Sequence, residues 1–167
     1  MALVTPTVDG RTAAASAISS EPKFFDIRTP YLEQGITTDY RARTDVLGVT
    51  IKVYASGGEN NLHAHVYEDH SFIVLEGRAR FHVGLDERDQ VVGPYEGVML
   101  PKGTCYRFES IGPENLVMLR LGAQPAGTPP TAVYPDGQGK SRAAEPWSHR
   151  VRVERPGHGF GDFTPSV

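Results

Sequence analysis

The sequence predicts an all-β protein, built as an antiparallel β-sandwich or barrel. Short segments in which apolar and polar residues alternate recur along the chain, each bounded by turn-forming residues. The 167 residues also include 18 glycines and 13 prolines, which suit short strands and tight turns better than long helices. A chain of this length is expected to form one domain with a sizeable core, and it contains no internal repeat.

The first third of the chain starts with small and polar residues. Residues 1–22 predict a mobile arm, or an arm that lies on a partner subunit. Residues 24–27 predict a short strand that ends at a Thr-Pro pair, and residues 31–44 predict a short helix. Within residues 45–55 apolar and polar side chains alternate, which predicts a half-buried strand.

The later strands follow the same pattern. They are predicted at residues 71–75, 79–83, 104–109 and 116–121, with a strand pair within 91–100 and a charged turn at 84–90. After Gly122 the chain is rich in proline, and residues 149–156 alone predict a further strand, at a sheet edge. The chain is therefore divided into an N-terminal arm (1–22), a β-barrel domain (23–125) and a loop-rich C-terminal extension (126–167).

Charge and cysteine content restrict the possible partners. A formal net charge of −3 gives no basis for a nucleic-acid or anionic-membrane surface. The single cysteine, Cys105, excludes an intramolecular disulfide and indicates a reducing compartment. The N-terminus has no long apolar segment, and no apolar run approaches the roughly 20 residues of a membrane span. We therefore expect a cytoplasmic protein without nucleic-acid or membrane partners.

Three of the six histidines lie in the segment Gly57–Gly77, GGENNLHAHVYEDHSFIVLEG. On a strand, His63 and His65 point to the same face because side chains alternate with a period of two. His70 is an odd number of residues further on, so a turn or bulge at residues 66–69 is expected to bring it back toward the pair. Imidazoles gathered in this way predict a transition-metal site.

The segment also resembles the first motif of the cupin superfamily. That motif is a glycine, five residues, His-x-His, three or four residues, a glutamate, six residues and a glycine. Gly57, His63, His65 and Gly77 fit it, and His70 stands where the glutamate is expected.

The second cupin motif has a Pro-x-Gly followed by a histidine. Pro101 and Gly103 match it, whereas Tyr106 stands at the histidine position. The resemblance spans about residues 45–122. It implies a double-stranded β-helix, also called a jelly roll, in which both motifs meet inside the barrel mouth. It also implies a homodimer.

On this resemblance the metal ligands are expected to be His63, His65 and His70. Tyr106 is either a fourth ligand, as a phenolate stabilised by the metal, or a catalytic hydroxyl beside the metal that positions or protonates substrate. The three imidazoles leave the charge of a divalent ion uncompensated, which suits a substrate that binds as an anion.

Four other residues near these motifs have less specific roles. Glu68 and Asp69 are expected to be solvated or to hold an imidazole tautomer, although either can replace His70 as an oxygen ligand. Cys105 is expected to be an inert buried thiol. Arg120 holds either an anionic substrate group or a surface position.

The predicted function is that of a metal-dependent cupin enzyme acting on a small organic substrate. The favoured type is an Fe(II) dioxygenase-like oxidoreductase. The cofactor is a divalent transition metal, with iron favoured and zinc, nickel, manganese or copper as alternatives. Two other functions stay open: a zinc- or nickel-dependent isomerase or cyclase with Tyr106 as general acid or base, and a non-catalytic cupin that binds a small ligand.

Overall fold

The computed structural model describes residues 21–56, 61–129, 132–135 and 151–163, and its secondary structure in these ranges consists of strands. In chain order they are β1 (Thr29–Gln34), β2 (Ile36–Arg43), β3 (Leu47–Tyr54), β4 (Ala64–His65), β5 (Asp69–Glu76), β6 (Ala79–Val83), β7 (Arg88–Val92), β8 (Gly97–Leu100), β9 (Tyr106–Ser110), β10 (Leu116–Ala123), β11 (Ala132–Val133) and β12 (Val153–Phe160). In the part of the chain that is described, no helix is long and apolar enough to cross a bilayer.

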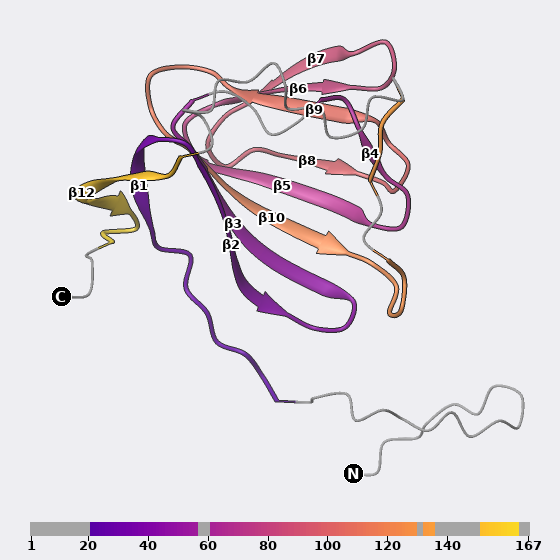
Figure 1. Ribbon diagram of the computed structural model, residues 1–167, viewed down its shortest axis with the longest axis horizontal. Coiled ribbons are helices and arrows are strands. Elements are labelled where there is room, and N and C mark those ends of the chain that lie inside the picture. The colour runs from indigo at the N-terminus through magenta and orange to yellow at the C-terminus, as the bar shows by residue number, and fades with distance from the viewer. Residues whose placement is uncertain (1–20, 57–60, 130–131, 136–150, 164–167) are drawn as a thin grey trace, which may run out of the picture.

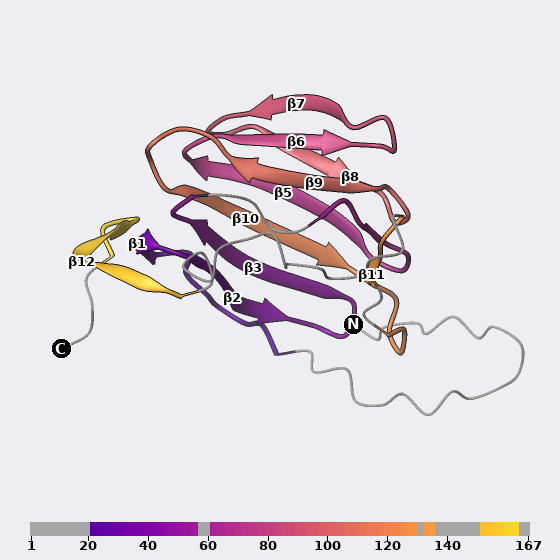
Figure 2. The same cartoon turned by 45° about the horizontal axis from the view of Figure 1, so that its top comes forward.

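Two antiparallel sheets form the body of the molecule. One has the order β2-β3-β10-β5-β8 and the other has the order β7-β6-β9. Figure 1 and Figure 2 show the second sheet lying over the first, with the β1–β12 pair at one end and the β4–β11 pair toward the other. Strands distant in sequence are neighbours in both sheets, as in a double-stranded β-helix. The predicted all-β fold is confirmed.

The space between the sheets is filled by apolar side chains from both of them. They are Tyr54, Phe72, Val74, Ala79, Phe81, Val92, Leu100, Tyr106, Phe108, Leu116 and Met118. Phe72 is central, with its ring centroid 5.6 Å from that of Phe81 and 5.5 Å from that of Phe108. Tilted aromatic pairs at this separation are favourable packing contacts, so the space between the two sheets is well packed around Phe72.

Strand β3 is buried on both of its faces, whereas the alternation predicted a half-buried strand. Its outer face presents Ile51 and Val53, which pack with Leu32 of β1 and Val117 of β10. Its inner face includes Lys52, which is 2% exposed. The prediction was wrong because the covering strand β1 is held in place by β12, far away in the sequence.

Two predictions in the first third of the chain are also wrong. Residues 24–27 contain no strand, and residues 31–44 form β1 and β2 instead of a helix. Gly35 separates these strands at φ +90, and a Cβ there would lie 2.5 Å from the carbonyl oxygen of Val151. Tertiary pairing therefore overrides the weak local pattern. The strand predicted at 149–156 is present as β12, although it begins later.

The side chain of Asn115 joins β1 to the barrel. Leu32 donates its backbone N–H to Oδ1 of Asn115 at 2.6 Å, and Nδ2 of Asn115 donates to the carbonyl oxygen of Leu32 at 3.0 Å. Both residues are buried, at 5% and 0% exposed. The amide thus pairs with Leu32 as a neighbouring strand would.

Asn115→Ala is expected to lower the free energy of unfolding by about 2–4 kcal/mol, because two buried backbone groups of Leu32 lose their partners. Urea denaturation of the wild type and the variant measures this loss. The matched control is Gln34→Ala, which removes an exposed bond to the carbonyl oxygen of Val151 and should change stability by less than about 0.5 kcal/mol. Equal losses in the two variants would contradict the assigned role.

Candidate metal centre

The histidine segment is placed by short pairings at one end of the barrel. The backbones of His63 and Tyr106 form two reciprocal hydrogen bonds, of 3.1 and 2.8 Å. Strand β4 ends at His65, residues 66–68 turn, and β5 then places His70 opposite Leu100 and Gly122. The turn predicted at residues 66–69 is therefore present, and both motifs meet at the same end.

The three histidines predicted as ligands lie side by side. The ring centroids of His63 and His65 are 5.1 Å apart, and those of His65 and His70 are 4.3 Å apart. The ring of Tyr106 lies 4.6 Å from that of His63. His63, His70 and Tyr106 are almost completely buried, whereas the side chain of His65 is 22% exposed. His65 thus provides the side of the cluster that solvent reaches.

The ligand atoms that converge include a carboxylate. Within the described residues, one ligand atom each from His65, Glu68 and His70 lie within 4.8 Å of one another. Oε2 of Glu68 is 3.0 Å from Nε2 of His70 and 3.7 Å from Nδ1 of His65. Two ligands that each bind a metal at 2.0–2.2 Å and at right angles are about 3 Å apart. The Glu68–His70 pair therefore has the spacing of two metal ligands, and the whole donor set has atom types that transition metals bind.

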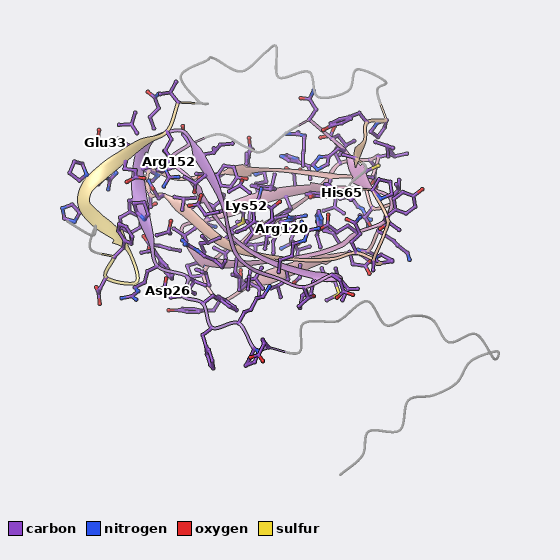
Figure 3. The ribbon with its side chains drawn as sticks, turned by 60° about the horizontal axis from the view of Figure 1, so that its bottom comes forward. Asp26, Glu33, Lys52, His65, Arg120 and Arg152 are labelled. Carbon is purple, nitrogen blue, oxygen red and sulfur yellow. The ribbon has the colours of Figure 1, made fainter. Side chains whose placement is uncertain are left out.

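A cation already lies against this donor set. Nη2 of Arg120 is 2.6 Å from Nε2 of His70 and 2.8 Å from Oε1 of Glu68. A guanidinium only donates hydrogen bonds, so Nε2 of His70 must be the acceptor. Its lone pair and the Glu68 carboxylate thus point at a positive charge, as metal ligands do. Figure 3 shows Arg120 and Lys52 inside the ribbon, with His65 toward one end.

This assignment fixes the other nitrogen of His70 as the donor. Nδ1 of His70 lies 2.8 Å from the hydroxyl oxygen of Tyr106, so Nδ1–H donates to that oxygen. Burial raises the pKa of Tyr106 well above its ordinary value, which keeps the hydroxyl a neutral phenol. Tyr106 therefore orients the His70 ring and still has its own proton to donate.

His63 lies at the edge of the converging group. The carbonyl oxygen of Asn61 accepts a hydrogen bond from Nδ1 of His63 at 2.9 Å, so the lone pair of the ring is on Nε2. Tyr134, which follows β11, stacks on the same ring with centroids 5.8 Å apart. Nothing in the proline-rich composition of residues 126–167 indicated that this extension contributes to the site.

The remaining residues singled out in the sequence are placed as follows. Oδ1 of Asp69 accepts a hydrogen bond from the backbone N–H of Lys102 at 2.7 Å, so Asp69 holds the Pro-x-Gly turn and points away from the histidines. Cys105 is free and half-buried. Gly57 and the arm at 1–20 lie outside the described residues.

Opposing effects set the charge state of the centre. Burial raises the pKa of Glu68, but the adjacent His70 ring and the Arg120 charge outweigh burial and leave this pKa below its usual value. Burial lowers the pKa of His70, and the neighbouring Glu68 carboxylate only partly opposes that effect. Burial, followed by the neighbouring His70 and His63 rings, lowers the pKa of His65 to about 3. The donor set is thus an anionic carboxylate with neutral imidazoles.

The metal-free protein is therefore expected to lose stability as the pH falls below the pKa of an unfolded histidine, about 6.5. Between that value and about 3 the unfolded chain binds a proton at His65 that the folded chain does not. The loss is up to about 1.4 kcal/mol per pH unit for this residue. Urea denaturation from about pH 7 to about pH 5 measures it. His65→Asn should make the dependence of stability on pH less steep, and an unchanged dependence would contradict the lowered pKa of His65. The control variant is His158→Asn, at an exposed position.

Gly122 makes room for the Glu68 carboxylate. A Cβ at Gly122 would overlap Oε1 of Glu68, whereas a Cβ at its neighbour Gly48 would meet only the carbonyl oxygen of Gly122, at 3.9 Å. Gly122→Ala is therefore expected to displace Glu68 and to weaken the binding of Zn²⁺ by about tenfold or more, as measured by competition with a chelator. Gly48→Ala should leave the affinity unchanged. Similar losses in both variants would show that the backbone, and not Glu68, is affected.

The part of the chain that matches known proteins is the barrel. The family model described as "Cupin domain" matches residues 50–122. A search of curated proteins found no significant relative. Similar solved structures include an uncharacterized conserved protein with a double-stranded β-helix domain from Klebsiella pneumoniae, at 17% identity and a TM-score of 0.55, covering 68% of this chain and 96% of that one.

Two further structures show the same fold. TT1209 from Thermus thermophilus is 15% identical with a TM-score of 0.52, covering 58% of this chain and 90% of that one. The Cnp3 cupin domain of Schizosaccharomyces pombe is 16% identical with a TM-score of 0.50, covering 53% of this chain and 61% of that one. At these identities the likeness establishes the architecture.

Proposed function

Because residues 50–122 match the cupin domain and the whole barrel has that fold, the chain belongs to the cupin superfamily, and from this premise we propose that it is a metal-dependent enzyme acting on a small organic substrate. The favoured type is an Fe(II) dioxygenase-like oxidoreductase. The observation that supports the proposal is the convergence of His65, Glu68 and His70 at one end of the barrel.

Two imidazoles and one carboxylate with open positions are typical of non-haem Fe(II) oxygenases. His65, Glu68 and His70 would hold the metal. His63, whose lone pair is on Nε2, is a fourth candidate ligand. The bound metal would supply Lewis acidity and, as iron, redox chemistry with dioxygen. Glu68 lowers the positive charge of such a centre relative to the three-histidine set expected from the sequence.

The protein side chains around the donor set have separate tasks. Tyr106 accepts the Nδ1–H of His70 and so fixes the direction of the Nε2 lone pair. Its own hydroxyl proton has no acceptor among the described residues, and the hydroxyl oxygen lies 2.8 Å from Nδ1 of His70. We infer that Tyr106 donates or positions a proton and is not a metal ligand, because a neutral phenol is a poor ligand.

A zinc- or nickel-dependent isomerase or cyclase is the second candidate. The observation that favours it is the same buried phenol, since a proton donor beside a Lewis acid suffices for proton transfer at a carbonyl compound. In that case Tyr106 acts as general acid or base and no dioxygen is consumed.

Metal analysis and oxygen uptake separate these functions. Protein purified without added metal is analysed for bound metal and then assayed for oxygen uptake with a panel of β-diketones and catechols. Stoichiometric iron with uptake supports the dioxygenase. Stoichiometric zinc or nickel without uptake rejects it in favour of the isomerase or cyclase. A protein that binds no divalent metal, yet binds a small ligand in the presence of chelator, would be a non-catalytic cupin.

A further inference from the structure

A cavity adjoins the candidate metal centre on the side of Glu68 and Arg120. Its volume is about 150 Å³, and its lining includes Arg120, Glu68, Gly48, Gly122, Thr44 and Thr128. At about 30 Å³ for each water molecule, the space holds about five waters or a molecule of similar size. None of the site histidines lines it, whereas Glu68 and its partner Arg120 do, so the cavity reaches the donor set at Glu68.

The guanidinium of Arg120 is only partly used. Its side chain is 14% exposed, and both of its hydrogen bonds are made by Nη2, to Glu68 and to His70. Within the described residues, Nε and Nη1 have no acceptor. A guanidinium has five N–H donors in a planar fork, so most donors of this cavity-lining residue are not used by the bonds to Glu68 and His70.

Several other polar groups of the cavity wall, those of Thr44, Gln124 and Thr128, are already bonded. Oγ1 of Thr128 donates to the carbonyl oxygen of Pro125, and Oγ1 of Thr44 accepts the backbone N–H of Leu47. Gly48 and Gly122 lie opposite each other on β3 and β10 and present no side chain. Arg43 and Asp45 also line the cavity, so its wall has two guanidiniums and, with Glu68, two carboxylates. Of the two guanidiniums it is Arg120 that contacts the candidate metal centre, and its fork suits the two oxygens of a carboxylate.

The position of Arg120 also bears on metal binding. Nη2 lies 2.6 Å from Nε2 of His70, along the lone pair that a metal would use at about 2.0–2.1 Å. The guanidinium and a metal cannot both bind that nitrogen. Arg120 must move off His70 before His70 can ligate a metal, and the adjacent cavity is the space into which it can move.

From these contacts we propose that the cavity is the binding site of a small monocarboxylate, that Arg120 is its anchor, and that this carboxylate draws the guanidinium away from His70. The proposed ligand carries one negative charge and has only a few non-hydrogen atoms. Because the anion stabilises the withdrawn Arg120, carboxylate and metal each strengthen the binding of the other, by the same factor. The coupling, but not the carboxylate site itself, rests on the function proposed above.

The carboxylate site is tested first without metal. Chemical shifts of the metal-free protein are followed by NMR during titration with propionate, and with propionamide as an uncharged molecule of similar size. We expect saturable binding of propionate and none of propionamide. Arg120→Met should abolish the binding. Gly48→Val adds a side chain to a cavity-lining residue whose Cβ would have no Arg120 atom within 4 Å, and it should weaken the binding by about tenfold or more. Arg120→Lys keeps the charge but not the fork, and it should bind propionate less tightly than the wild type.

Equal binding of the acid and the amide would overturn the proposal, as would unchanged propionate binding in folded Arg120→Met. The coupling is tested by the affinity for Zn²⁺, measured by chelator competition with and without saturating propionate. Propionate should raise the affinity of the wild type about fivefold or more. Arg120→Met should bind Zn²⁺ more tightly than the wild type and show no response to propionate.

A similar propionate effect in both proteins would mean that the carboxylate ligates the metal directly, and it would reject Arg120 as the link. Weaker Zn²⁺ binding in Arg120→Met would reject the competition between guanidinium and metal. Failure of all variants to bind Zn²⁺ would instead reject the metal centre of the proposed function, while the NMR titration still decides the carboxylate site.

Discussion

Glu68→Gln is expected to lower the affinity for a divalent metal at least about 100-fold, which is the largest change predicted for a single side chain of the centre. Glu68 is the carboxylate of the converging set, 3.0 Å from Nε2 of His70. The amide keeps the shape of the side chain and can still accept a hydrogen bond from Arg120, but it loses the charge. Chelator competition with Zn²⁺ or Co²⁺ measures the change.

The adjacent carboxylate provides the control for Glu68. Asp69 accepts the backbone N–H of Lys102 and points away from the histidines, so Asp69→Asn should leave the metal affinity within about threefold of the wild type. An equal loss in the two variants would mean that general charge, and not ligation by Glu68, governs the affinity. An unchanged affinity in Glu68→Gln would leave His63, His65 and His70 as the ligands, as the sequence suggested.

Tyr106→Phe is expected to reduce turnover by about 10²- to 10⁴-fold while the metal stays bound. The variant removes the phenol proton and leaves Nδ1 of His70 without its partner, but the ring of residue 106 still fills the core beside Phe72. Turnover is measured on the substrate found in the oxygen-uptake or isomerase assays, and metal content is measured on the same preparation.

Tyr106 has two roles that this variant separates. Loss of metal comparable to that of Glu68→Gln would make Tyr106 a ligand. Unchanged turnover with bound metal would limit the residue to packing beside His63 and Phe72. A matched control is Tyr54→Phe, since Tyr54 is another buried tyrosine of the barrel core and is not part of the donor set.

Much of the barrel could be predicted from the sequence because its strands alternate locally. The same was true of the turn between His65 and His70, since an odd spacing cannot keep two side chains on one face of a strand. The site was harder to predict. Glu68 lies in a turn, where neither the strand period nor the motif spacing tells which way a carboxylate points.

Other features of the structure could not be predicted because they depend on pairing between strands that are far apart in the sequence. Tyr134 reaches His63 because β11 pairs with β4, and two residues of pairing leave no recognisable pattern in the sequence. Lys52 fits a polar face in the alternation, yet that face is the interior of the barrel. Arg120 could be assigned to the face it shares with Met118, but its contact with His70 depends on the register of β10 against β5.

The pairing of β1 with β12 also has a consequence for how the chain folds. Thr29 lies opposite Phe160, so the strand that covers Ile51 and Val53 cannot pair until a segment far later in the chain has been synthesised. Contacts between such distant positions form slowly, since loop closure must precede them. During translation the outer surface of β3 is thus exposed to chaperones and to other nascent chains for longer than the barrel interior.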